Sequence, residues 1–445
     1  MTIWTDFGFV SCPYTTDPIS ATAQGDSLLV GREQEINKLI SRLQSSPRHT
    51  TVEGKFGVGK TSLISVAGFR LQQSFQKGES NFGPLIPLGE PFQVSPEATL
   101  ESFQRDLFYR VAEAFRVHGA RLDATGRRVP KQKDVDRWLH EPIFHMRSAG
   151  FSTPLGGLSA GRSRSPNATA AYYDFGFPRA MKASLESCFP SPAYGGFIAV
   201  VDNLELMRTS QSVRDLLELM RDTVFSQKGI RWILCGGPGV FRTAAATPRL
   251  ADHLADPIQV DPIPDELMPE VVSRRIEHYR IKNRPAPVIP VGAGGFWYLY
   301  DLVNRNLRTA LSLADDFSEW LHWQFGADSS KSEDLELLEV WLAETADKCH
   351  AAAQEWIDAR EWIIFDTLAV HGGICRPSSD YDDFGFHSPD AMRSSIRMLK
   401  DANLVTHEKD EMNKRRKIVA MTPSGWLVAY ARTGYSLPGE YASLK

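Results

Sequence analysis

The sequence predicts an α/β protein whose parallel sheet is followed by a helical region and a smaller C-terminal domain. Three observations carry this prediction. The β-prone run at residues 50–53 is followed by a glycine-rich turn and then by an apolar helix. The apolar runs at residues 195–202 and 230–235 are continuous, which is typical of strands buried on both faces of a parallel sheet. Helical segments separate these runs, and this alternation of strands and helices indicates the α/β class.

The expected elements begin with an irregular lead-in, residues 1–28, which a few aromatic side chains would anchor. Residues 29–263 would form the sheet domain, with an insertion at about 120–190 that begins in a stretch rich in glycine, serine and basic residues. Residues 264–350 are expected to be helical, and residues 351–445 to form a separate domain. Apolar spacing and turn residues predict helices at 30–43, 95–118, 178–188 and 212–225, a loop at 78–92, and a last strand at 256–261.

Length and composition exclude several classes of protein. The chain has 445 residues, enough for two or three domains, and its 42% hydrophobic residues are too many for a disordered chain. It contains no apolar run of about 18 residues and no secretory-signal pattern at its start, so we expect no membrane span. The five cysteines are scattered and form no C-x-x-C pair, which argues against a disulfide framework or a zinc knuckle. We therefore expect a reduced, cytoplasmic protein.

A phosphate-binding loop follows the first strand, because the residues from Gly54 to Thr61 satisfy the pattern G-x-x-x-x-G-K-T. Glycines allow the positive φ angles that direct N–H groups at phosphate oxygens, and the next helix presents its positive dipole end. Lys60 would neutralise the β- and γ-phosphates, and Thr61 would bind Mg²⁺. A chance glycine-rich loop is disfavoured by the flanking strand and apolar helix. The predicted ATP-binding residues are Gly54, Gly57, Val58, Gly59, Lys60, Thr61 and Ser62.

Two carboxylates are candidates for the chemistry beside this loop. Asp202 ends the apolar run at 195–202, and an acid at that position can reach Mg²⁺ through water. Glu205 is the nearest carboxylate that could orient or deprotonate an attacking water, although it could equally be a solvated residue at a helix start. Asn203, rather than a glutamate, directly follows Asp202. Hydrolysis is therefore expected to be slow.

Three stretches, residues 29–36, 54–61 and 197–205, resemble the initiator-type branch of the AAA+ ATPases, which includes the archaeal and eukaryotic origin-recognition ATPases. The bacterial STAND-type signalling ATPases have a similar order of parts. The resemblance implies a P-loop NTPase sheet with a helical lid at 264–350. It also implies that Val30 and Gly31 pack on the adenine.

The same resemblance implies two arginine roles. Arg308, in the lid motif that begins at Asn306, would touch the γ-phosphate; an ordinary surface arginine on an amphipathic helix is the alternative. Arg249 would be an arginine finger that reaches the phosphate of a neighbouring subunit, which implies a homo-oligomer. The strand at 230–235 ends in Cys235 followed by glycines, without the polar residue that this family carries there.

The C-terminal residues 351–445 resemble a winged-helix domain. A capped helix begins near Ser388, and a basic segment at 414–417 lies in a predicted β-hairpin. Because the net charge is −4, any contact with nucleic acid must come from such a local patch. The alternative is that these cations merely solubilise the surface. The residues predicted to contact double-stranded DNA are Arg393, Arg397, Lys400, Lys414, Arg415, Arg416 and Lys417.

Two functions from different classes are consistent with these features. The first is an ATP-dependent switch that assembles and binds DNA through the winged helix. The second is a STAND-like sensor or adaptor of a bacterial defence or signalling system, which would act on a partner protein. A subunit whose ATP site is structural and turns over very slowly is a third interpretation, because of Asn203.

Overall fold

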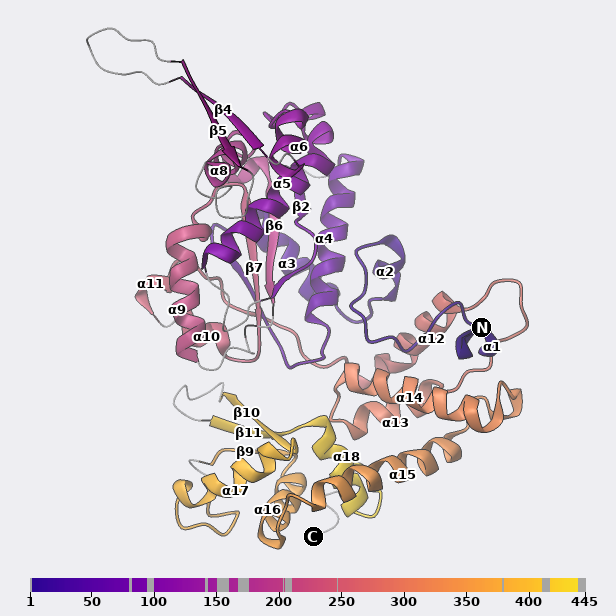
Figure 1. Ribbon diagram of the computed structural model, residues 1–445. Coiled ribbons are helices and arrows are strands. Elements are labelled where there is room, and N and C mark those ends of the chain that lie inside the picture. The colour runs from indigo at the N-terminus through magenta and orange to yellow at the C-terminus, as the bar shows by residue number, and fades with distance from the viewer. Residues whose placement is uncertain are drawn as a thin grey trace.

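A parallel sheet of six strands forms the centre of the N-terminal half (Figure 1). The computed structural model describes residues 2–79, 82–93, 100–140, 143–149, 160–166, 176–202, 204, 210–245, 247–377, 380–409 and 417–438. The strand order is β2-β6-β7-β1-β8, with β3 also paired to β6, and every pair is parallel. The strands are β1 (Thr50–Glu53), β2 (Leu85–Pro87), β3 (Phe92–Gln93), β6 (Gly196–Asp202), β7 (Ile230–Gly236) and β8 (Ile258–Gln259).

The sheet is buried on both faces, as its continuous apolar strands predict. Alternate residues of β6 enter opposite clusters: Phe197 packs with one and Ile198 with the other. The α/β prediction is therefore confirmed by the sheet itself. One face is covered by α3 (Glu33–Ser45) and α4 (Lys60–Lys77), and the other by α5 (Leu100–Ala124), α8 (Phe177–Cys188) and α9 (Ser210–Met220).

The prediction of a loop at 78–92 is wrong, because β2 and the start of β3 lie there. Both strands are too short to show an alternating pattern. Among the described residues β2 pairs only with β6, and a strand with one partner tolerates Pro87. The last strand is shorter than the predicted 256–261. The predicted start of the helix at 95–118 lies outside the described residues, and its end extends to Ala124.

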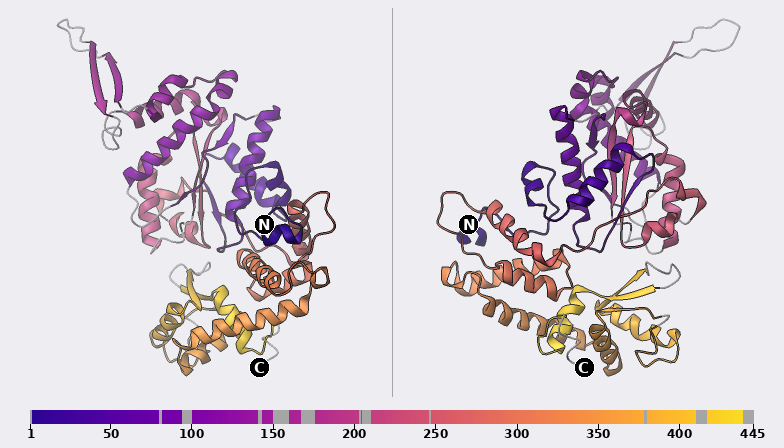
Figure 2. Two further views of the ribbon diagram at one scale, coloured as in Figure 1. Left: turned by 45° about the vertical axis from the view of Figure 1, so that its right-hand side comes forward. Right: turned by 180° about the vertical axis from the view of Figure 1, so that it is seen from behind.

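The insertion predicted at about 120–190 contains the antiparallel hairpin of β4 (Ile143–Ala149) and β5 (Ala160–Pro166). This hairpin projects from the end of the sheet domain that lies away from the helical region (Figures 1 and 2). The helix α6 (Gln132–His140) packs on α5, and α8 belongs to the sheet core through Met181. Both ends of the segment are therefore integral to the sheet domain.

The helical region is built from α12 (Met268–Tyr279), α13 (Ala293–Leu302), α14 (Leu307–Phe325) and α15 (Leu335–Gln354). Residues 1–28 are not irregular throughout, because they contain α1 (Ile3–Phe7) and α2 (Ala23–Leu28), but aromatic side chains anchor them as predicted. Phe9 is fully buried in the core of the helical region, and the hydroxyl of Tyr14 donates to the carbonyl of Val291 at 2.7 Å. The aromatic side chains of this segment thus hold it on the helices that follow the sheet.

The C-terminal unit has its own core and a three-stranded antiparallel sheet of order β10-β11-β9. Helix α15 continues past the predicted boundary at residue 350 and packs along α18. The hydroxyl oxygens of Tyr298 and Tyr430 are 2.7 Å apart across this junction. Figure 2 shows the unit beside the helical region. Its elements are α16 (Ala359–Val370), β9 (Ile374–Cys375), α17 (Pro389–Asp401), β10 (Val405–Lys409), β11 (Lys417–Met421) and α18 (Pro423–Arg432).

In the described part of the chain, no helix combines the length and the apolar character needed to cross a membrane.

Candidate functional site

The loop from Gly54 to Gly59 connects the carboxyl end of β1 to the first turn of α4. Gly57 and Gly59 have φ angles of +82° and +96°, the left-handed region that favours glycine. The ammonium group of Lys60 is buried and donates to the carbonyl of Gly54 at 2.8 Å. The loop therefore has the geometry of an anion cradle, with a cation at its centre and the positive end of a helix dipole beneath it.

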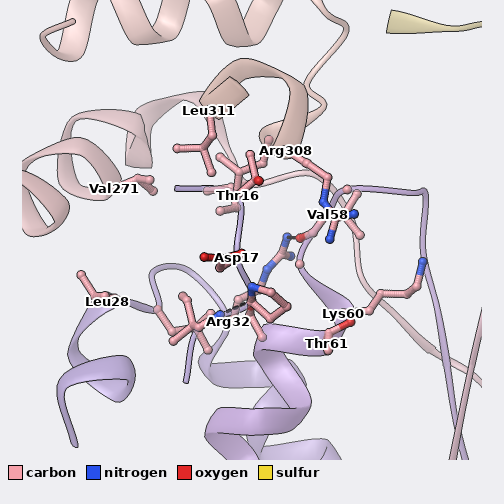
Figure 3. Close-up of a pocket in the computed structure, with 18 of the residues that line it drawn as sticks. Thr16, Asp17, Leu28, Arg32, Val58, Lys60, Thr61, Val271, Arg308 and Leu311 are labelled. Atoms are coloured by element: carbon pink, nitrogen blue, oxygen red, sulfur yellow. Dashed lines mark hydrogen bonds between the residues drawn. The ribbon is translucent and has the colours of Figure 1, made fainter. Parts of the chain in front are cut away.

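A cavity of about 260 Å³ lies beside this loop, between the sheet and the helical region (Figure 3). Its walls come from the N-terminal segment, the phosphate loop, the loop before β3, the end of β6 and the helical region. Two of the predicted ATP-binding residues, Gly54 and Gly31, do not line it. The residues of the prediction that do line it are Val30, Gly57, Val58, Gly59, Lys60, Thr61, Ser62, Asp202 and Arg308.

Thr61 and Asp202 meet at one end of the cavity. The hydroxyl of Thr61 donates to Oδ2 of Asp202 at 2.9 Å, although 141 positions separate them along the chain. A hydroxyl and a carboxylate are ligands that Mg²⁺ accepts, and Mg²⁺ commonly takes its other ligands from phosphates and water. Among the described residues no cluster of three or more His, Cys, Asp or Glu could hold a metal ion. Thr61 and Asp202 could thus supply two ligands to a Mg²⁺.

The predicted catalytic carboxylate, Glu205, lies outside the described residues, as does Asn203. Arg249, the predicted finger, lies on the short helix α11 (Pro248–Ala251), and 60% of its side chain is exposed. Its guanidinium contacts the carboxylate of Glu218 at 3.0 Å. Arg249 does not line the cavity of its own chain.

The helical region closes directly on the phosphate loop through Asn306. The side-chain amide of Asn306 donates to the carbonyl of Phe56 at 3.2 Å, and its oxygen accepts from the N–H of Thr309 at 3.1 Å, which caps α14. A Cβ at Gly57 would lie 2.4 Å from that oxygen, so only glycine permits this approach. The guanidinium carbon of Arg308 lies 4.9 Å from the centre of the Phe56 ring. Arg308, for which the resemblance implies a contact with the γ-phosphate, is thus held over the loop.

The N-terminal segment forms a second closure that sequence analysis did not predict. Thr16 and Asp17 line the cavity, and the N–H of Ile19 donates to the hydroxyl of Ser62 at 3.0 Å. On the other side, the buried guanidinium of Arg275 donates to the carbonyl of Pro13 at 3.0 Å. The segment therefore bridges the helical region and α4. Its proline- and threonine-rich sequence gave no signal for this position.

Two buried charged residues beside the loop were also missed. Arg32 donates to the carbonyl of Val58 at 3.1 Å and lines the cavity. Glu53, the last residue of β1, accepts from the N–H groups of Gly239 at 3.1 Å and Phe241 at 2.6 Å. This carboxylate joins β1 to the turn after β7. That turn is where the sequence lacks the polar residue expected from the family resemblance. An acidic residue at the end of an otherwise uncharged strand was the available signal.

The predicted DNA-contacting residues divide into two groups. Arg393, Arg397 and Lys400 lie on the exposed side of α17, whose opposite side is buried through Ile396. Arg393 contacts Asp390 at 2.7 Å, and Arg397 lies 3.8 Å from Asp401. In the second group, Lys414, Arg415 and Arg416 lie outside the described residues, and Lys417 is the first residue of β11.

No protein-family model and no curated protein matches the sequence. Among solved structures, the chain is similar to the Aeropyrum pernix ORC1 protein in complex with DNA, with 14% identity over 95% of this chain and 96% of that chain and a TM-score of 0.44. It is similar to a Walker-type ATPase of Pyrococcus abyssi, with 14% identity over 94% and 99% and a TM-score of 0.45. It is also similar to Drosophila ORC bound to DNA, with 14% identity over 97% of this chain and 90% of that chain and a TM-score of 0.39. At such low scores, the fold and the site rest on this chain's own sheet order and phosphate loop.

The contact between α14 and the loop can be tested with the variant Asn306→Asp. Aspartate caps a helix as well as asparagine does, but it cannot donate to the carbonyl of Phe56. We expect the stability of the protein to change by less than about 1 kcal/mol, while cleavage within residues 54–62 by a protease becomes faster. The control is Asp334→Asn at the start of α15, which exchanges the same two side chains at a cap remote from the loop. Unchanged cleavage in Asn306→Asp would contradict the contact.

Proposed function

We propose that the protein binds ATP with Mg²⁺ in the cavity between the sheet and the helical region, and that it hydrolyses ATP slowly. One observation carries this proposal: a glycine-rich loop with a buried lysine, whose Thr61 hydroxyl contacts Asp202 at the end of a neighbouring parallel strand. These are the parts that phosphoryl-transfer sites use to hold phosphates and Mg²⁺. The closure of the cavity by the helical region supports a nucleotide that contacts both.

Each part of the nucleotide has a candidate neighbour. The phosphates would lie on the loop and Lys60, and Mg²⁺ on Thr61 and Asp202. The adenine would pack against Val30, which lines the cavity. Arg308 is a candidate contact for the γ-phosphate, because it lines the same cavity from the first turn of α14. Mg²⁺ would neutralise charge on the transferring phosphoryl group, and Glu205 remains the proposed carboxylate for the attacking water.

The nucleotide site is tested by Lys60→Ala, with Lys55→Ala as the matched control. Lys55 belongs to the same loop but contributes only its backbone carbonyl to Lys60. Because a charge-assisted contact to phosphate is lost, we expect ATP affinity to fall by about tenfold or more in Lys60→Ala and to change little in Lys55→Ala. Isothermal titration calorimetry with ATP and Mg²⁺ measures both. Equal affinity in the two variants would contradict the proposed site.

The C-terminal unit is the proposed output of this site. Its attachment to the helical region through α15 and α18 means that a movement of the lid on nucleotide binding would carry the unit with it. The exposed cations at positions 393, 397 and 400 recur at helical spacing on one side of α17, a pattern that suits phosphates flanking a major groove. We propose that the unit is a winged helix whose DNA binding, together with assembly into homo-oligomers, depends on the nucleotide state.

The oligomer would bring Arg249 to the nucleotide of a neighbouring subunit. The exposure of this side chain supports that role, and its contact with Glu218 would have to break or be shared when the subunits assemble. A second candidate function is favoured by the acidic partners on α17. Asp390 and Asp401 reduce the positive charge of the patch, which suits a sensor or adaptor that acts on a partner protein and binds no DNA.

The two functions are separated by replacing Arg393, Arg397 and Lys400 together with alanine. If α17 contacts DNA phosphates, the affinity of the variant for a generic duplex falls. The negative slope of log K against log salt concentration becomes shallower by up to about 3. The control removes three cations from the loop after α12: Arg280, Lys282 and Arg284. Fluorescence anisotropy at several salt concentrations, with ATP present, provides the measurement. Absence of duplex binding in the wild type would favour the partner-protein function.

A further inference from the structure

A second cavity, of about 170 Å³, lies at the opposite edge of the sheet from the phosphate loop. It is bounded by the first residues of β1 and β7, namely Thr50 and Ile230, and by the loops that precede these strands. The carboxyl ends of the same strands face the nucleotide site. The cavity is therefore separate from the site described above, although helix α3 and strand β1 extend from one to the other.

The lining of this cavity is strongly cationic. Four basic residues line it: Arg42, Arg48, Lys228 and Arg231. The described lining contains no aspartate or glutamate. His49 also lines the cavity, but burial lowers its pKa to about 4, so it is neutral at pH 7. Burial lowers the pKa of Arg42, and the charge of the Asp256 carboxylate partly opposes this effect. The guanidinium of Arg42 donates to the backbone carbonyl of Asp256. The cavity thus carries an excess of positive charge.

Arg231 is a half-buried cation of the cavity wall that has no carboxylate partner among the described residues. In that part of the chain its guanidinium donates to the carbonyls of Ser46 at 3.3 Å and Pro192 at 3.4 Å. Burial lowers the pKa of this guanidinium. Removing a guanidinium from water without an anionic partner is costly, and its planar fork matches the oxygens of an oxyanion. A ligand with several acceptor oxygens answers this positive charge, because a guanidinium presents five N–H donors and an ammonium presents three.

We propose that this cavity binds a phosphate group, with Arg231 as its central contact. A phosphate has the negative charge and the several acceptor oxygens that the lining requires, and the cavity is too small for a folded partner. The group could belong to a free small phosphate or to a nucleic-acid backbone, which present the same chemistry. The inference is independent of ATP binding, because none of these residues lines the first cavity.

The test uses the full-length Lys60→Ala protein, so that the phosphate loop contributes little to binding. Inorganic phosphate is titrated into this protein and into the same protein with Arg231→Gln, and heat is recorded by calorimetry. Because a charge-assisted contact is lost, we expect at least about tenfold weaker affinity in Arg231→Gln. The matched control is Arg127→Gln, since Arg127 also donates to a backbone carbonyl, that of Tyr194, without lining the cavity.

Arg48→Gln and Lys228→Gln provide a second route if Arg231→Gln fails to fold, because both side chains are exposed. Each should weaken phosphate binding about two- to fivefold. A single-stranded oligonucleotide that displaces phosphate would assign the group to nucleic acid, and failure to displace it would assign a free phosphate. Equal phosphate affinity in the cavity variants and in their Lys60→Ala parent, or no phosphate binding by that parent, would overturn the proposal.

Discussion

The approach of Asn306 to the phosphate loop is the constraint on which the arrangement of the molecule depends. One side chain caps α14 with its oxygen and holds the carbonyl of Phe56 with its amide. The absence of a Cβ at Gly57 makes this distance possible. Because the helical region rests on the loop itself, residues of both parts line the cavity beside the loop. The same glycine pattern that forms an anion cradle therefore also provides the surface on which the lid docks.

This contact places the proposed nucleotide site between the sheet domain and the helical region, which are joined by more than one connection. The N-terminal segment joins them a second time, through Ile19 on Ser62 and through Arg275 on Pro13. Helix α15 of the helical region packs along α18 of the C-terminal unit. A change at the loop thus has a continuous packed route to α17. Interfaces of this kind convert small shifts at a ligand into rigid-body movement.

The local features of the site could be predicted from the sequence, because each depends on residues close together in the chain. The phosphate loop is one continuous motif, and Asp202 is identified by the apolar strand that it ends. Glu53 and Arg32 could not be assigned roles in this way, since their importance lies in bonds to distant segments. The strand β2 was missed because three residues that include a proline show no periodicity. The docking of residues 1–28 depended on which aromatic side chains meet, which spacing does not indicate.

The most direct test of the account is hydrogen exchange of the full-length protein with and without ATP and Mg²⁺. If the nucleotide lies between the loop and the lid, amides at residues 54–62 become protected, and so do those at 306–311 and in the N-terminal segment at 15–19. These three segments meet only at the first cavity, so their joint protection would locate the ligand there. Protection confined to residues 54–62 would show that nucleotide binds without engaging the lid, and would contradict the account.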